Sequence, residues 1–105
     1  MNLYQVPDPL PEDEQFDLLI PDRGVRIERI VSAGQTTPED DWYDQNQDEW
    51  VALLRGEATL EYADGRRRHL CPGDQLFIPA HQKHRVVYTS THPPCIWIAV
   101  HGPLQ

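Results

Sequence analysis

Residues 73–84 read Gly-Asp-Gln-Leu-Phe-Ile-Pro-Ala-His-Gln-Lys-His, and this stretch decides the fold. Gly73 belongs to a turn sequence, and the apolar run that follows it predicts a short strand. Pro79 ends that strand, because proline has no backbone N–H to donate to a sheet. His84 stands at the start of a further run with β-branched and aromatic residues. The stretch therefore predicts two short strands with a histidine where the second begins.

A second segment of the same kind, Glu49 to Gly56, lies upstream. An acid and a glycine flank a run whose apolar centre predicts a buried strand. Residues 57–63 then alternate between apolar and polar side chains, which is typical of a strand with one face in water. Asp64-Gly65 is a strong hairpin signal. Further strands are predicted at residues 25–31, 66–70, 75–78, 85–89 and 95–101.

About seven or eight short strands at this spacing, with no convincing helix, predict an all-β sandwich or barrel. The 105 residues suffice for one such domain. Residues 1–21 differ from the rest, because they are acidic and contain prolines at alternate positions, which favour an extended chain. We predict that residues 1–21 form an N-terminal arm and residues 22–105 the barrel, with residues 32–48 as a long acidic loop.

The charge distribution restricts the partners that the chain can bind. The net charge is −8, and the first 50 residues carry 13 acids against three arginines. This balance argues against nucleic acid and anionic membranes, because binding phosphates requires basic side chains. No apolar stretch has the length of a membrane span, and no signal peptide is evident. Cys71 and Cys95 form neither a redox pair nor a disulfide framework, so we expect a reducing cytoplasm.

Several enzyme classes lack support because their motifs are missing. The sequence contains no G-x-S-x-G elbow, no phosphate-binding G-x-x-x-x-G-K and no G-x-G-x-x-G. Serine hydrolases, P-loop nucleotidases and dinucleotide-binding enzymes are therefore disfavoured.

The two strand-and-glycine segments resemble the motifs of the cupin family, in its small single-domain form. The matching residues are Glu49 and Gly56 in the first motif, E-x6-G, and Gly73, Pro79 and His84 in the second, G-x5-P-x-G-x2-H. His81 stands where the family usually has a glycine. The resemblance extends over roughly residues 30–101 and implies a jelly-roll barrel, a double-stranded β-helix, with a site inside it.

The resemblance also implies a divalent metal in the barrel, commonly Fe, Mn, Ni, Zn or Cu. The family's usual ligands are an H-x-H pair, the glutamate of the first motif and the histidine of the second. By position, Glu49 and His84 match the last two. The H-x-H pair is absent, because residues 42–45 read Trp-Tyr-Asp-Gln. Its loss removes two imidazoles, the ligands that suit borderline-soft transition metals.

Neighbouring side chains offer replacements for the missing pair. Asp44 reaches Glu49 and His84 if the chain bulges or kinks there. The resulting set of two carboxylates and one imidazole suits Mn, Fe(II) or Zn better than Cu. His81 is a fourth candidate ligand because it lies three residues from His84. His69 and His92 are interpreted as surface residues.

Two further residues are expected to bind a ligand beside the metal. Gln45 lies four residues from Glu49 and so shares its strand face. Tyr88 lies four residues from His84 and is expected to share its face in the same way.

Three functional hypotheses remain open. In the first, the barrel binds a divalent metal (Fe, Mn or Zn) and a small polar molecule, and acts as a dioxygenase, lyase or isomerase. In the second, it is a metal-free barrel that binds a small molecule without catalysis. In the third, which has less support, the barrel is a scaffold for interaction with another protein. We also expect a homodimer, because the arm carries apolar residues that could cover an edge strand.

Overall fold

The computed structural model describes all 105 residues and confirms the prediction of an all-β chain. Its strands form two antiparallel sheets, with the order β1-β2-β8-β3-β6 in the larger and β5-β4-β7 in the smaller. The structure contains no helix that could cross a membrane. The strands are β1 (Gln15–Leu18), β2 (Arg26–Ser32), β3 (Asp48–Arg55), β4 (Ala58–Tyr62), β5 (Arg67–Leu70), β6 (Gln75–Ile78), β7 (His84–Thr89) and β8 (Cys95–Gly102).

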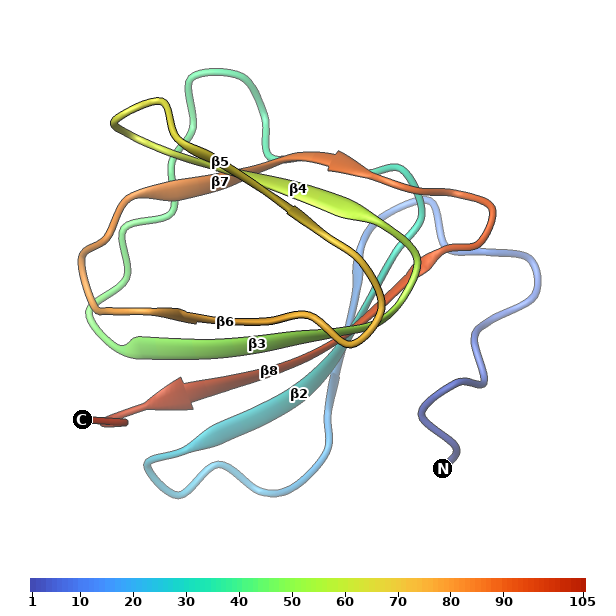
Figure 1. Cartoon of the computed structure of the whole chain (residues 1–105). Helices are drawn as coiled ribbons and strands as arrows, with labels where there is room; N and C mark the ends of the chain where they lie inside the picture. The colour runs from blue at the N-terminus through green and yellow to red at the C-terminus, as the bar shows by residue number, and fades with distance from the viewer.

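The two sheets face each other, with β4, β5 and β7 on one side and β2, β3, β6 and β8 on the other (Figure 1). Because side chains alternate along a strand, every second residue points between the sheets. The inward residues of β4 are apolar and buried, as the alternation over residues 57–63 predicts, and so are those of β3 after Glu49. They pack into a core made of Val51, Leu53, Ala58, Leu60, Tyr62, Leu70, Leu76, Ile78, Cys95 and Trp97.

The predicted loop occupies residues 33–47 and runs along the free edge of β7. The backbone N–H of Thr37 donates to the carbonyl of Val86 at 2.9 Å, and the N–H of Tyr43 donates to the carbonyl of His84 at 2.8 Å. These bonds satisfy edge groups that would otherwise need water. They also hold Tyr43 beside β7, where it borders the space between the sheets.

The N-terminal residues are held against the larger sheet. β1 pairs with β2, and the Arg29 side chain, which is 5% exposed, binds Asp17 of β1 at 2.7 Å. The same guanidinium donates to the backbone carbonyls of Leu3 and Gln5. Part of the predicted arm is therefore an edge strand, held by a buried cation and by backbone pairing.

Candidate functional site

A cavity of about 360 Å³ lies between the two sheets. Apolar side chains from both sheets, among them Val51, Leu60 and Trp97, form one part of its wall. A concave apolar wall with a few convergent polar groups is the usual form of a small-molecule site. The polar part of the wall is formed by Glu14, Arg26, Glu28, Tyr43, Gln45, Glu49, His84 and His101.

Four buried side chains on four different strands form what we call the barrel cluster: Glu28 of β2, Glu49 of β3, His84 of β7 and His101 of β8. The register of the larger sheet places Arg26, His101 and Glu49 in one row across β2, β8 and β3. Glu28 follows Arg26 by two residues and therefore points to the same face. His84 approaches this row from the smaller sheet.

The barrel cluster is a chain of alternating acids and imidazoles. Nε2 of His101 lies 3.3 Å from Oε1 of Glu28 and 3.5 Å from Oε2 of Glu49. Nε2 of His84 lies 3.7 Å from Oε1 of Glu49. Two buried nitrogens, Nε2 of His101 and Nε of Arg26, lack a hydrogen-bond partner of good geometry. Because such groups are costly to leave unpaired, they point to a bound molecule or ion.

The imidazole of His84 is held in one orientation. Its Nδ1 lies 2.9 Å from the carbonyl oxygen of Gln82, which can only accept a hydrogen bond, so Nδ1 carries the proton. Nε2 is then the free nitrogen that faces Glu49. The ring also stacks on Tyr43, with 5.5 Å between ring centroids. In functional histidines, the ring nitrogen that faces away from the ligand commonly has a hydrogen-bond partner that fixes the ring.

Burial shifts the pKa values of Glu49, His84 and His101 so that each side chain favours its neutral form. Burial and the charge of Glu28 raise the pKa of Glu49 to about 7, against the opposing effect of Arg26. Burial also lowers the pKa of His84. The pKa of His101 is lowered by burial and by Arg26, with Glu28 acting in the other direction. Near neutral pH the imidazoles are therefore uncharged, and Glu49 exchanges a proton readily.

Carboxyl groups outnumber guanidinium groups in the cavity wall. Glu14, Glu28 and Glu49 supply three carboxyl groups, whereas Arg26 is the one guanidinium. The imidazoles do not compensate, because their pKa values are lowered. Since unpaired buried charge is unfavourable, this part of the wall favours a cation.

The donor atoms of the barrel cluster suit a divalent metal in type, and in pairs they have the spacing of metal ligands. Two imidazoles and two carboxylates are ligands that Zn²⁺, Mn²⁺ and Fe²⁺ accept. Neighbouring donors lie 3.3–3.7 Å apart, and neighbouring ligands around one ion lie about 3–3.5 Å apart when metal–ligand distances are about 2.1 Å. No three of these donors lie within 4.8 Å of one another, so three of them would hold one ion only after small side-chain rotations.

The structure brings some of the predicted site residues together and separates others. Glu49 and His84 meet inside the barrel, and Gln45 lines the same cavity. Asp44 and His81 pair with each other instead, with Nδ1 of His81 3.0 Å from Oδ1 of Asp44. Both side chains are exposed, and neither lines the cavity.

Tyr88 does not share a face with His84, contrary to the sequence expectation. Val86 pairs with Leu60 and Tyr88 with Thr59, so two steps along β7 match one step along β4. This bulge reverses the alternation of β7 after Val86. Tyr88 is consequently 45% exposed on the outside of the sheet.

Two residues of the barrel cluster were not predicted from the sequence. Glu28 lies in a strand whose apolar and charged residues are mixed, so the sequence does not show which face is buried. His101 ends the last strand and is brought to Glu49 only by the register of β3 with β8. The sequence carries one signal for each residue. Glu28 lies two residues from Ile30, and His101 lies four residues from Trp97, so each shares a strand face with a residue that also lines the cavity.

Comparisons with known proteins agree with the motif resemblance. A model of the cupin domain family matches residues 28–101. No curated protein matched the chain. A solved structure of a proposed mannose-6-phosphate isomerase from Ralstonia eutropha JMP134 is 44% identical with a TM-score of 0.90, over 98% of this chain and 96% of that chain.

Two more distant structures show the fold alone. A cupin superfamily protein from Desulfitobacterium hafniense DCB-2 is 19% identical with a TM-score of 0.74, over 88% of this chain and 79% of that chain. The DMSP lyase from Ruegeria pomeroyi DSS-3 is 21% identical with a TM-score of 0.63, over 77% of this chain and 39% of that chain. The jelly-roll fold expected from the two motifs is thus confirmed, and the chain belongs to the cupin family.

Proposed function

We propose that the barrel binds a divalent cation together with a small polar molecule, and that the two together form the reactive complex of an enzyme. The observation that carries this proposal is the buried barrel cluster, in which two neutral imidazoles and two carboxyl groups line one cavity. The excess of carboxyl groups over guanidinium groups in the wall supports a cation. Glu49, His84 and His101, with Glu28 behind them, are the residues that would hold it.

The chain's own residues suggest what the second molecule is. Arg26 lies at the cavity with its side chain 42% exposed, and its Nε atom, 3.8 Å from Oε2 of Glu28, has no hydrogen-bond partner, which suits a phosphate or carboxylate group near the mouth. The relative that is 44% identical carries the name of a sugar-phosphate isomerase. A phosphorylated sugar is therefore the first molecule to test.

Proton transfer is the chemistry that Glu49 can perform on such a molecule. An aldose–ketose isomerase takes a proton from one carbon and returns it to the next, and a group with a pKa near 7 does both at neutral pH. The pKa of Glu49, raised to about 7, fits this task. A divalent cation bound beside it would polarise a carbonyl oxygen of the sugar.

Metal analysis of the full chain, purified without chelators or a nickel column, tests the proposal. We expect up to one equivalent of Mn or Fe in the barrel, and a higher melting temperature when Mn²⁺ is added. At a concentration of about 100 times the Kd, binding stabilises the folded state by about 2.7 kcal/mol, which a melting curve resolves. Glu49→Gln should abolish the shift, whereas Glu39→Gln, the same change at an exposed loop glutamate outside both clusters, should keep it.

A metal-free binding barrel is the second candidate function. The geometry of the barrel cluster favours it, because the donor atoms follow one another in a chain and no three of them lie within 4.8 Å of one another. If neither Mn²⁺, Fe²⁺ nor Zn²⁺ raises the melting temperature through Glu49, the metal proposal fails. A shift with mannose 6-phosphate alone, lost in Arg26→Met, would then support the metal-free barrel.

A further inference from the structure

A second group of metal-binding side chains lies outside the barrel. Glu57 precedes β4, His69 lies in β5, and Cys71 follows β5. We call these residues the outer triad. All three are exposed, and their donor atoms all lie within 4.8 Å of one another. No other group of His, Cys, Asp and Glu side chains in the structure is so closely spaced.

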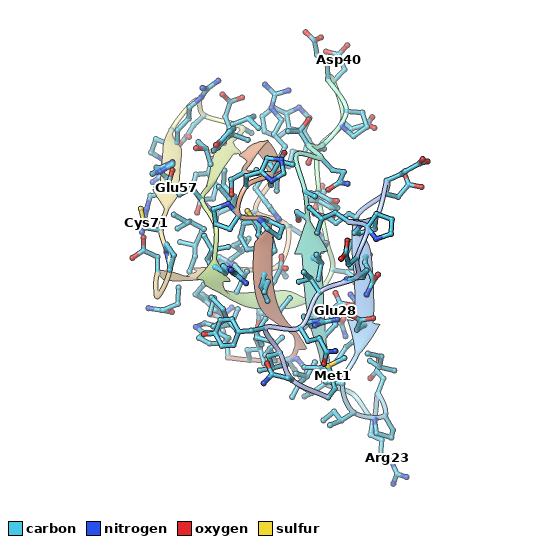
Figure 2. All side chains as sticks on the ribbon, turned by 90° about the vertical axis from the view of Figure 1, so that its right-hand side faces the viewer. Met1, Arg23, Glu28, Asp40, Glu57 and Cys71 are labelled. Atoms are coloured by element: carbon cyan, nitrogen blue, oxygen red, sulfur yellow. The ribbon has the colours of Figure 1, made fainter.

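Backbone pairing brings the outer triad together. The register of β4 with β5 pairs Thr59 with His69 and Ala58 with Leu70. One further step places Glu57 opposite Cys71, and the alternation of side chains puts both on the face of Thr59 and His69. Ala58 and Leu70 point the other way and are fully buried. Figure 2 shows Glu57 and Cys71 close together at one edge of the molecule, away from Glu28.

The imidazole of the outer triad is already oriented. Its Nδ1 lies 3.0 Å from Oγ1 of Thr59, which leaves Nε2 facing Glu57 at 3.8 Å from Oε2. A metal-binding histidine commonly has such a partner on its other nitrogen.

The carboxylate of the outer triad has no basic partner. Glu61, which also lies on the outer face, pairs with Arg67 at 2.8 Å and with Arg85 at 2.6 Å. Glu57 pairs with neither a lysine nor an arginine, and its one ionic neighbour is His69. Its charge is therefore available to a cation.

We propose that the outer triad is a second metal site and that it takes Zn²⁺. Zinc binds thiolate, imidazole and carboxylate, and a thiolate ligand disfavours Mg²⁺, Ca²⁺ and Mn²⁺. Three protein ligands leave one tetrahedral position, which is open to water here because the side chains are exposed. Zinc displaces the thiol proton of Cys71, so affinity falls as the pH is lowered.

Cobalt substitution of the full chain under reducing conditions tests the site. Co²⁺ bound by a thiolate gives a charge-transfer band in the near ultraviolet, which carboxylate and imidazole ligands do not give. We expect the wild-type protein to show this band and to lose it when Zn²⁺ displaces Co²⁺. Cys71→Ser should abolish the band although Cys95 remains, because Cys95 is buried. Glu49→Gln should keep it, since the barrel contributes no thiol to the triad.

The affinity for Zn²⁺ tests whether the three side chains act together. Glu57→Gln should weaken Zn²⁺ binding at least about tenfold, and His92→Gln, a change at an exposed histidine elsewhere, should leave it unchanged. All of these positions except Glu49 are exposed, so the variants are expected to fold. A wild-type protein without the band, a band that persists in Cys71→Ser, or equal Zn²⁺ affinity in Glu57→Gln would overturn the proposal.

Discussion

The carboxyl group of Glu49 lies between two imidazoles and is influenced by two charges of opposite sign. Burial has the largest effect and raises the pKa of Glu49; the charge of Glu28 raises it further, and that of Arg26 lowers it. The protonated form therefore persists to about pH 7. A side chain that gains and loses a proton at neutral pH is suited either to proton transfer or to binding a cation after deprotonation.

The stability of the chain should reveal this raised pKa. Because the folded state binds the Glu49 proton more tightly than the unfolded state does, this contribution is fully present below pH 4.5 and is lost as the pH rises to about 7. Glu49→Gln keeps a neutral side chain at every pH. We expect the wild-type protein to lose about 3 kcal/mol relative to this variant across that range, measured by urea unfolding in the presence of a chelator.

Wild type must be compared with Glu49→Gln because His84 and His101 change the stability with pH in the opposite direction. Their pKa values are lowered on folding, so they stabilise the folded state increasingly as the pH rises toward 6.5. Both proteins keep these histidines, and the difference isolates Glu49. Parallel stability profiles for wild type and Glu49→Gln would show that the carboxyl pKa is not raised.

A matched pair of variants should move the pKa of Glu49 in opposite directions. Glu28→Gln removes a neighbouring negative charge and is expected to lower it, whereas Arg26→Met removes a positive charge and is expected to raise it. The side-chain carboxyl resonance of Glu49, followed by NMR as a function of pH, gives both values. Shifts in the same direction would contradict the charge arrangement described for the cavity wall.

At the scale of elements, most strands were predicted to within one or two residues. The alternation of apolar and polar side chains predicted β4, and Gly73 and Pro79 predicted where β6 begins and ends. β1 was missed, because its four residues are a strand only through pairing with β2. The outward position of Tyr88 was missed because a bulge depends on the partner strand, which local alternation does not report.

The candidate site was predictable only where a motif fixed the spacing. Glu49 and His84 stand at motif positions in the sequence, whereas Glu28 and His101 reach them through the register between distant strands. The outer triad has the same origin, since Glu57 and Cys71 face each other only after β4 and β5 pair. Pairing between distant segments is a property of the whole sheet, and for that reason the sequence showed neither the contribution of Glu28 and His101 nor the outer triad.

The connection between β3 and β4 depends on Gly56. Its φ is +83°, and a Cβ atom there would lie 2.8 Å from the carbonyl oxygen of Pro94 and 2.8 Å from Oγ of Ser90. Gly65 has a similar φ of +91° but has nothing within 4 Å. Gly65→Ala should therefore cost only the conformational strain, about 1–2 kcal/mol. Gly56→Ala should cost at least about 3 kcal/mol, because the backbone must also move.

Thermal unfolding of the two glycine variants measures this difference. Both substitutions impose the same change of residue type at a positive φ, so Gly65→Ala is the control for strain alone. We expect a clearly lower melting temperature for Gly56→Ala than for Gly65→Ala. Equal melting temperatures would mean that the close approach of β3 and β4 to residues 90–95 does not constrain the fold.

At the scale of the whole molecule, the two sheets differ in how their edges are covered. The edge of β7 is covered by the loop through Thr37 and Tyr43. β1, at the edge of the larger sheet, has no such cover, and Phe16 and Leu18 are 54% and 55% exposed. An uncovered edge strand with exposed apolar side chains tends to pair with another chain. We therefore expect a homodimer that forms through β1.

Leu18→Lys tests this expectation without disturbing the cavity, because Leu18 does not line it. A lysine on an edge strand opposes pairing between chains, so the variant should sediment as a monomer at concentrations where the wild-type protein is a dimer. Tyr88→Lys is the control, since Tyr88 is similarly exposed at 45% but lies on the smaller sheet. A dimer that survives Leu18→Lys but dissociates in Tyr88→Lys would place the interface on the smaller sheet, beside the outer triad.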